Sequence, residues 1–136
     1  MNQKWTTDWL NLFNAGELDE MIKLYVPDVD FEDRILNRKE NTAVGVKAFC
    51  ETFFQENSGR HAFHVHRYSG DESGGAAEWI WEATDAAGFI GVPNVPKGTI
   101  TRVKGVSVLR FRDNKIAAQW DYWDSASLFE QLRASQ

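Results

Sequence analysis

Hydrophobic residues in the first sixty positions recur mainly at the 3.6-residue spacing of helices. The spacing predicts helices over residues 5–14, 17–25 and 44–57. Thr42 is expected to cap the third helix, because its side chain can accept a hydrogen bond from a free N–H group of the first turn. Pro27 is expected to end the second helix, since proline cannot continue one. The predicted buried sides comprise Trp5, Trp9, Leu12, Phe13, Leu18, Met21, Ile22, Tyr25, Val46, Phe49, Phe53 and Phe54.

The two-residue period of β-strands replaces this spacing after the second helix, and again from about residue 60 to the end. The alternation predicts strands over residues 29–35, 61–69, 76–84, 99–111 and 115–123. Because helices dominate the first half of the chain and strands the second, the order indicates an α+β domain. Its helices are expected to pack on one face of a curved antiparallel sheet.

Turn-forming residues mark the connections between these elements. Residues 37–41 are polar and are predicted to form a loop, and Asp113-Asn114 predicts a tight hairpin turn. Ser125 is a candidate cap for a short closing helix. The segment 88–98 is the one long connection, and its composition suits a lid or rim over a pocket as well as a plain wide hairpin.

Two carboxylates stand on strand faces that are otherwise largely apolar. Asp33 alternates with hydrophobic residues on its strand, and Asp121 lies between Gln119 and Trp123 on one face of the last strand. Such an acid faces either water or a pocket that uses it. The inward set predicted for four strands comprises Val29, Phe31, Asp33, Ile35, Ala77, Trp79, Trp81, Ala83, Val103, Gly105, Ser107, Leu109, Phe111, Ala117, Gln119, Asp121 and Trp123.

The opposite face of the last strand is apolar too, which suggests that something covers it. We expect a homodimer that forms through the outer sheet face, with Ile80, Val106, Val108, Trp120 and Tyr122 in the interface. The alternative is that the two aromatic rings only cover the stems of arginine and lysine side chains of the same chain.

Composition narrows the class of protein. A chain of 136 residues with 43% hydrophobic residues is expected to form one globular domain, and its net charge of -5 argues against nucleic acid or an anionic membrane as the partner. No apolar run approaches the roughly 18 residues that span a bilayer, and the first residues lack a signal-peptide core. Cys50 is the only cysteine, which fits a reducing compartment. We therefore expect a soluble, cytoplasmic protein.

Three stretches carry a resemblance to a known family: NAGELDEMIKLYVPDVDFED, GFIGVP and GVSVLRFRDNKIAAQWDYWD. They resemble the SnoaL-like polyketide cyclase and ketosteroid isomerase branches of the nuclear-transport-factor-2-like superfamily. The resemblance covers nearly the whole chain and implies a single SnoaL-like domain over residues 1–136. It also implies a cone-shaped curved antiparallel sheet wrapped by three helices from the N-terminal half, a short C-terminal helix, and a pocket at the wide end.

The resemblance assigns a role to each carboxylate. Asp33 takes the position of the general base in isomerase-like sequences, and Asp121 that of the acid/base residue in SnoaL-like cyclases. The implied reaction removes a proton from an acidic methylene and closes a ring by an intramolecular aldol step. An isomerase that shifts a double bond by proton transfer is the related possibility. No metal or organic cofactor is implied, because the substrate itself delocalises the charge.

Two departures from the related enzymes limit the choice of reaction. Trp9 and Ser107 replace the tyrosine and the protonated aspartate that form the oxyanion hole of the isomerases, so enolate stabilisation should be weaker. The Trp79-Ile80-Trp81 stretch replaces the Arg-x-Asp that limonene-epoxide hydrolase-like enzymes need to activate water, which disfavours epoxide opening.

The candidate site follows from these assignments. Burial beside aromatic rings disfavours the charged form of an acid and raises its pKa toward neutrality, where it can take and return a proton. Asp121 and Asp33 are the candidate catalytic residues. The candidate substrate-binding residues are Trp9, Phe53, His64, His66, Trp79, Trp81, Ser107, Gln119 and Trp123.

The role of the two histidines and the class of protein both stay open at this point. The pair His64 and His66 has a spacing that metals use, but no third ligand is evident, and a histidine that orients a substrate carbonyl is the preferred interpretation. The aromatic content of 13% suits a cavity for a hydrophobic small molecule. The competing class of protein is a binding or dimerisation module without catalysis.

Overall fold

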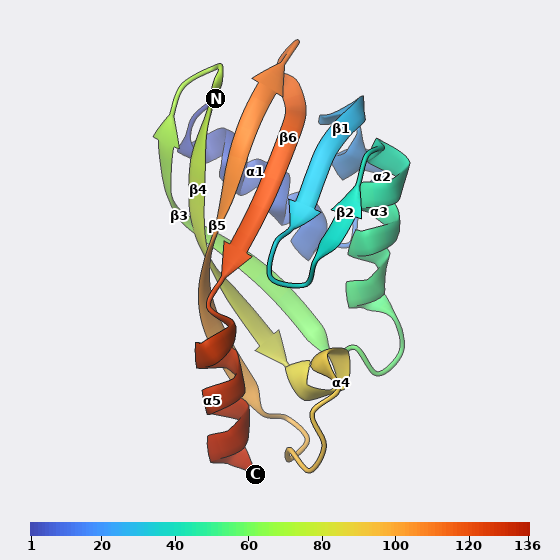
Figure 1. Cartoon of the computed structure of the whole chain (residues 1–136), viewed down its shortest axis with the longest axis vertical. Helices are drawn as coiled ribbons and strands as arrows, with labels where there is room; N and C mark the ends of the chain where they lie inside the picture. Colours follow the sequence, from blue (N-terminus) through green and yellow to red (C-terminus); the bar gives the residue numbers. More distant parts are fainter.

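Six strands form one curved sheet in the order β2-β1-β6-β5-β4-β3 in the computed structural model, which describes residues 1–136 (Figure 1). Neighbouring strands are antiparallel except for β1 and β6, which are parallel. The strands are β1 (Tyr25–Asp33), β2 (Arg38–Glu40), β3 (Arg60–Gly70), β4 (Gly74–Thr84), β5 (Ile100–Arg112) and β6 (Lys115–Trp123). The helices are α1 (Gln3–Asn14), α2 (Leu18–Ile22), α3 (Ala43–Glu51), α4 (Ala86–Ile90) and α5 (Ser125–Ser135), with a 3-10 turn at Thr52–Phe54. The predicted α+β fold is confirmed.

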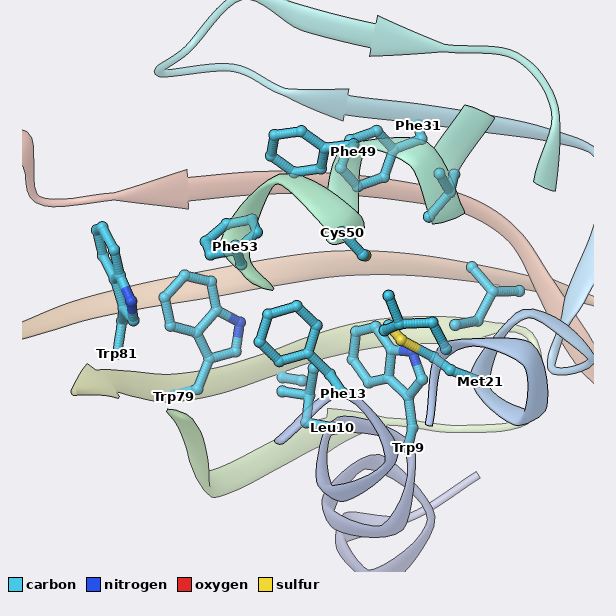
Figure 2. Close-up of a cluster of buried hydrophobic side chains, with 14 of the residues drawn as sticks. Trp9, Leu10, Phe13, Met21, Phe31, Phe49, Cys50, Phe53, Trp79 and Trp81 are labelled. Carbon is cyan, nitrogen blue, oxygen red and sulfur yellow. The ribbon is translucent and has the colours of Figure 1, made fainter. Parts of the chain in front are cut away.

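The main core lies between the inner face of the sheet and the helices α1, α2 and α3. Figure 2 shows aromatic side chains from α1, α3 and β4 converging on this space. Trp9 is fully buried at its centre, and Phe13 contacts Phe53 and Phe63 edge to face, with ring centroids 5.3 and 5.2 Å apart. Burying rings of this size is the largest contribution that side chains can make to the hydrophobic stabilisation of a small domain.

The second helix is shorter than predicted. It ends at Ile22, and Tyr25 begins strand β1, which runs through Pro27. The pairing of β1 with β6 is irregular between Tyr25 and Asp30, so Pro27 lies where no regular ladder hydrogen bond is lost. The prediction of a helix over 17–25 is therefore wrong at its end.

The polar residues 37–41 contain a strand that the hydrophobic pattern did not indicate. Arg38–Glu40 form β2, which pairs with Phe31, Glu32 and Asp33 at the edge of the sheet. A three-residue edge strand contributes little to the core, so its sequence shows no apolar alternation. Asn37, with φ of 56°, provides the left-handed position of the connecting turn.

Several predicted local features can be compared directly. Thr42 caps α3 by accepting a hydrogen bond from Gly45 N at 3.0 Å, as predicted. Ile35 and Phe54 were placed on buried faces but are 36% and 46% exposed, because Ile35 lies beyond the end of β1 and Phe54 lies in the 3-10 turn that follows α3. The cap of α5 is Asp124 rather than Ser125, since the Asp124 side chain accepts from Ser127 N at 3.0 Å.

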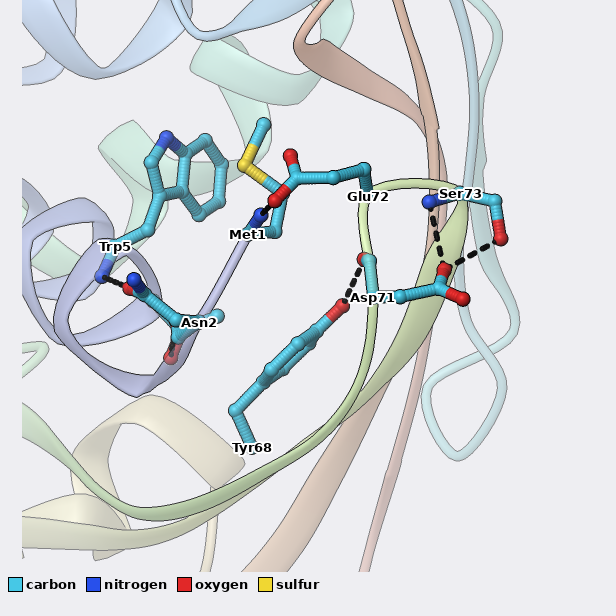
Figure 3. A network of polar contacts seen from close by, with 8 residues as sticks. Met1, Asn2, Trp5, Tyr68, Asp71, Glu72 and Ser73 are labelled. Atoms are coloured by element: carbon cyan, nitrogen blue, oxygen red, sulfur yellow. Dashed lines mark hydrogen bonds and ion pairs between the residues drawn. The ribbon is translucent and has the colours of Figure 1, made fainter.

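Hairpin turns close the long strands. Asp113 and Asn114 both have positive φ, which is the conformation of the tight turn that their sequence predicts. At the β3–β4 turn, Tyr68 donates to the Asp71 carbonyl and the Asp71 side chain accepts from Ser73 (Figure 3). The Glu72 carboxylate in the same turn pairs with the N-terminal ammonium.

Strand β6 is central in the sheet, flanked by β1 and β5. Ile116 was predicted to face outward but is fully buried in the core, beside a register shift in the β5–β6 ladder between Arg110 and Phe111. A shift of this kind changes which face a residue lies on. None of the helices is long and apolar enough to cross a membrane.

Candidate functional site

The register of the sheet brings the two predicted acids into one row. Asp33 on β1 lies opposite Asp121 on β6, and Asp121 lies opposite Ser107 on β5. Residues opposite each other on adjacent strands point to the same face and stand about 5 Å apart. The parallel pairing of β1 with β6, two strands far apart in the sequence, therefore creates the acid pair.

A second row sets the tryptophans beside the acids. Trp79 lies opposite Gly105, and Gly105 lies opposite Trp123. Because Gly105 has no side chain, the Trp79 ring can lie directly over the β5 backbone. The Trp79 indole reaches Ser107, and the Trp123 indole reaches Asp33.

Both acids line a hollow between the sheet and the helices. Its cavity volume is only about 50 Å³. All the space between the lining atoms, including open solvent, amounts to about 610 Å³. Fifteen of its 19 lining residues are hydrophobic, and no lysine, arginine or histidine is among them. Small-molecule sites usually measure about 300–1,000 Å³, so a ligand of ordinary size would fit only if lining side chains moved.

Five residues that line the hollow are not fully buried. Leu36 from the β1–β2 turn is exposed, and the half-buried ones are Phe63, Phe89, Asp121 and Trp123. Phe89 stacks on Phe53 with ring centroids 4.6 Å apart. The segment 88–98, predicted to be a lid, a rim or a wide hairpin, begins in the short helix α4, and Phe89 of this helix lines the hollow.

Asp121 is held by three donor contacts from two neighbours. Ser107 Oγ donates to its Oδ1 at 2.6 Å, and Gln119 Nε2 lies 3.1 Å from Oδ1 and 3.2 Å from Oδ2. Burial raises the pKa of Asp121 to about 7, the charge of Asp33 adds to the rise, and the Ser107 and Gln119 hydrogen bonds oppose it. An acid that titrates near neutral pH can both take and return a proton there.

Asp33 is buried at the end of β1, where it also closes the turn. Its Oδ1 accepts from the backbone N–H groups of Ile35 and Leu36 at 3.1 and 2.9 Å. Trp123 Nε1 lies 3.2 Å from both carboxylate oxygens. Burial raises the pKa of Asp33, and these donors oppose the rise because they stabilise its charged form.

Most of the predicted binding residues line the hollow. They are Phe53, Trp79, Trp81, Ser107, Gln119 and Trp123. Trp9 does not line it, because its indole is fully buried and donates to Tyr25 OH at 3.1 Å. Ser107 and Trp9 were considered above as possible donors to a substrate enolate. In the structure they donate to Asp121 and to Tyr25 instead.

The structure places His64 and His66 outside the hollow. Their side chains are 59% and 50% exposed, and they lie near Glu82 and Glu78 on the outer sheet face. Neither can orient a molecule bound beside Asp121. No three of the histidine, cysteine, aspartate and glutamate side chains gather into a group that could hold a metal ion.

Two residues that were not among the predicted site residues contribute to the site. Tyr25 was expected on a helix and instead starts β1, where its hydroxyl donates to Gln119 Oε1 at 2.6 Å. Phe89 lies in a segment without clear periodicity. The sequence indicated that Tyr25 is buried, but its predicted place on a helix concealed that it lies on the same strand face as Val29.

Stability should fall as the pH rises from about 4 to about 7. The folded-state pKa of Asp121 lies above its ordinary value of 3.8, so the folded state binds the proton more tightly and is favoured below that value. This contribution is lost as the pH rises through about 7, and Asp33 acts in the same direction. The free energy of unfolding is measured by denaturant titration for Asp121→Asn and the wild-type protein. The difference, variant minus wild type, should be about 2 kcal/mol more positive at pH 8 than at pH 5. An equal difference at both pH values would contradict the raised pKa.

Comparison with known proteins places this site in a family context. Residues 6–119 match the SnoaL-like domain family, so the chain belongs to that family. A search of curated proteins gave no match.

Solved structures share the fold at low sequence identity. A proposed SnoaL-like polyketide cyclase from Shewanella putrefaciens superposes with a TM-score of 0.77 at 17% identity, over 97% of this chain and 96% of that one. IdmH, a proposed polyketide cyclase from Streptomyces antibioticus, gives 0.75 at 20% identity, over 91% and 92%. A protein with a ketosteroid isomerase-like fold from Catenulispora acidiphila, solved with trimethylamine, gives 0.78 at 12% identity, over 98% and 95%.

Proposed function

We propose that the protein is a cofactor-independent enzyme that transfers protons on a hydrophobic carbonyl compound, with Asp121 as the acid/base residue. The observation that carries this proposal is a carboxyl group in an aromatic hollow whose pKa is raised to about 7. The family membership and the relatives that are proposed polyketide cyclases support the same class of reaction.

The chemistry begins with proton removal from a carbon next to a carbonyl group. A carboxylate oxygen of Asp121 takes the proton, and the electron pair of the C–H bond moves into the enolate. In an aldol closure this carbon then bonds to a second carbonyl carbon of the same substrate, whose oxygen receives a proton from Asp121. In an isomerisation, Asp121 returns the proton to a different carbon. Either path restores Asp121 to its starting state.

The donor groups around the hollow favour a substrate that delocalises its own charge. Ser107 and Gln119 donate to Asp121, and Trp123 donates to Asp33. With these protons occupied, the hollow offers a new enolate oxygen little of the electrostatic stabilisation that an oxyanion hole provides. An active methylene between two carbonyl groups needs the least such help, which favours the aldol cyclase over a steroid-type isomerase.

Asp33 acts on Asp121 through its charge. Its carboxylate is held in place by two backbone N–H groups and the Trp123 indole. A fixed negative charge in the adjacent position makes the loss of a proton from Asp121 harder, and so raises the proton affinity of the base. We therefore assign Asp33 the electrostatic part and Asp121 the proton transfer.

Hydrogen–deuterium exchange tests the proposal without knowledge of the natural substrate. A series of β-keto esters of increasing aromatic size is incubated with the protein in deuterated buffer, and loss of the methylene proton signal is followed by NMR. We expect protein-dependent exchange whose rate rises with pH and levels off above about 7, as Asp121 becomes a carboxylate. Exchange no faster than with heat-unfolded protein, for every ester in the series, would refute the enzyme assignment.

A second candidate function is binding of a small molecule without catalysis. The relative from Catenulispora acidiphila was solved with trimethylamine. A hollow with aromatic walls, two acids and no cation suits a small organic cation as well. An NMR titration with trimethylamine distinguishes the two functions, since a binding module would shift the resonances of this ligand and would not exchange the methylene protons of the β-keto esters.

The homodimer through the outer sheet face is also a proposal. Tyr122 is 37% exposed there, which supports it. Arg34 and Arg110 lie over the Trp120 ring at 5.2 and 5.7 Å, so part of this face is covered by the chain itself. A monomeric molar mass in light scattering would rule the dimer out. The cytoplasmic location is proposed from the single cysteine and would be refuted by recovery of the protein outside the cytoplasm.

A further inference from the structure

Two chains of hydrogen bonds run through the core and end on Asp121. The first passes from Trp9 Nε1 to Tyr25 OH at 3.1 Å, from Tyr25 OH to Gln119 Oε1 at 2.6 Å, and from Gln119 Nε2 to the carboxylate. The second passes from Trp79 Nε1 to Ser107 Oγ at 3.0 Å and from Ser107 Oγ to Asp121 Oδ1 at 2.6 Å. Apart from Asp121 itself, every member of both chains is buried.

The direction of each chain is determined by the indole at its head. An indole N–H can only donate, so the oxygen of Tyr25 must accept from Trp9 and its own proton must point to Gln119 Oε1. Gln119 then has its amide oxygen at Tyr25 and its NH₂ group at Asp121. The reverse orientation would leave the Tyr25 proton without an acceptor and set an amide oxygen against a carboxylate.

The same reasoning applies to the Ser107 arm. Trp79 donates to Ser107 Oγ, so the single hydroxyl proton of Ser107 is free to point to Asp121. Both chains therefore present a donor to Asp121. The nearest acceptor atoms, Gln119 Oε1 and Ser107 Oγ, already accept from Tyr25 and Trp79. Oδ1 receives the shorter contacts from both neighbours, and Oδ2 receives only the longer Gln119 contact.

We propose that Tyr25 and Trp79 are positioning residues, which aim the donors of Gln119 and Ser107 at Asp121, favour its charged form and leave Oδ2 as the oxygen that takes the proton. The consequence for catalysis rests on the function proposed above, whereas the effect on Asp121 does not. Neither residue needs to touch a reacting atom in this role, although both line the hollow.

The surroundings of Asp121 explain why such donors are needed. Asp33 faces it from β1, and the thiol of Cys50 and the hydroxyl of Tyr25, whose pKa values are both raised by burial, face it from α3 and β1. No cation lines the hollow to balance the charge. The aimed donors are therefore the main groups that stabilise the carboxylate.

The test is an NMR titration of the protein with ¹³C-labelled aspartate carboxyl groups, in which Asp121 is assigned by its loss in Asp121→Asn. We expect Tyr25→Phe to raise the titration midpoint of Asp121 by about half a pH unit, and Ser107→Ala by about one. Trp79→Phe keeps Ser107 but removes the indole N–H that donates to Ser107 Oγ. This variant should also raise the titration midpoint of Asp121. A purely structural role for Tyr25 or Trp79 would lower stability without moving the midpoint.

Tyr68→Phe is the matched control. It removes a tyrosine hydroxyl that donates to the Asp71 carbonyl in the β3–β4 turn (Figure 3). Tyr68 is on β3, three strands away from Asp121 across the sheet, so the midpoint should stay unchanged. If Tyr25→Phe does not fold, Trp79→Phe carries the test through the independent arm. Folded variants with an unchanged or lowered midpoint would overturn the proposal.

The titration uses no substrate, so it separates the two proposals. Shifted midpoints in a protein that exchanges no methylene protons would leave the positioning role intact and refute the enzyme. Exchange by the wild-type protein with unshifted midpoints in the variants would support the enzyme and refute the positioning role.

Discussion

Replacing Asp121 with asparagine is expected to lower the rate of methylene exchange by about 10²- to 10⁴-fold, the usual contribution of a general base. An asparagine oxygen in the Oδ1 position can still accept from Ser107 Oγ and Gln119 Nε2. Only the longer Gln119 contact to Oδ2 is lost, so the fold should survive. The amide cannot take a proton at neutral pH. Exchange rates measured by NMR at pH 8, together with ligand-induced shifts, should show lost exchange and retained binding.

The matched control for this change is Asp30→Asn. Asp30 is exposed on β1, the strand that pairs with β6, and the substitution removes the same charge from a residue outside the hollow. Its exchange rate should equal that of the wild-type protein. If Asp121→Asn stays within about tenfold of the wild-type rate, Asp121 is not the base and the assignment fails.

Gly105→Ala is expected to destabilise the protein by about 3 kcal/mol, at the upper end of the cost of overpacking. A Cβ at this position would lie closer than 3.0 Å to three atoms of the Trp79 ring. That ring cannot move freely, because its N–H donates to Ser107 and its face meets Phe63 in an edge contact with centroids 4.9 Å apart. Urea denaturation of the variant and the wild-type protein gives the difference directly.

A double-mutant cycle shows whether the collision with Trp79 is the cause. In the Trp79→Leu background the space over Gly105 is open, so adding Gly105→Ala there should cost much less than it does in the wild-type protein. We expect a coupling energy of about 1–2 kcal/mol. Additive effects would mean that Gly105 is needed for its backbone rather than for the space it leaves.

The site shows how two weakly informative sequence features combine. An acid among apolar strand residues has an ordinary explanation in a turn, and Asp33 does close one through Ile35 and Leu36. It becomes part of a site only because β1 pairs with β6 in the register that sets Asp33 opposite Asp121. Periodicity within a strand carries no information on which strand will lie beside it or in which register.

The errors of the sequence-based predictions also have local causes. Tyr25 continued a helical pattern by chance, and pairing with the rest of the sheet outweighed that weak local preference. His64 and His66 were considered for the pocket because their strand alternates, but the alternation itself does not say which set faces inward. The structure leaves that set exposed.

The sequence by itself determined the class of the fold, the positions of four long strands and three helices, and the two acids worth attention, because hydrophobic periodicity follows directly from burying one face of each element. Only the tertiary structure decided that the acids share one row, that Trp9 and Tyr25 support Gln119, and that the histidines lie outside. These relations depend on strand order, register and a glycine beneath a tryptophan, which are contacts between distant parts of the chain that no local pattern records.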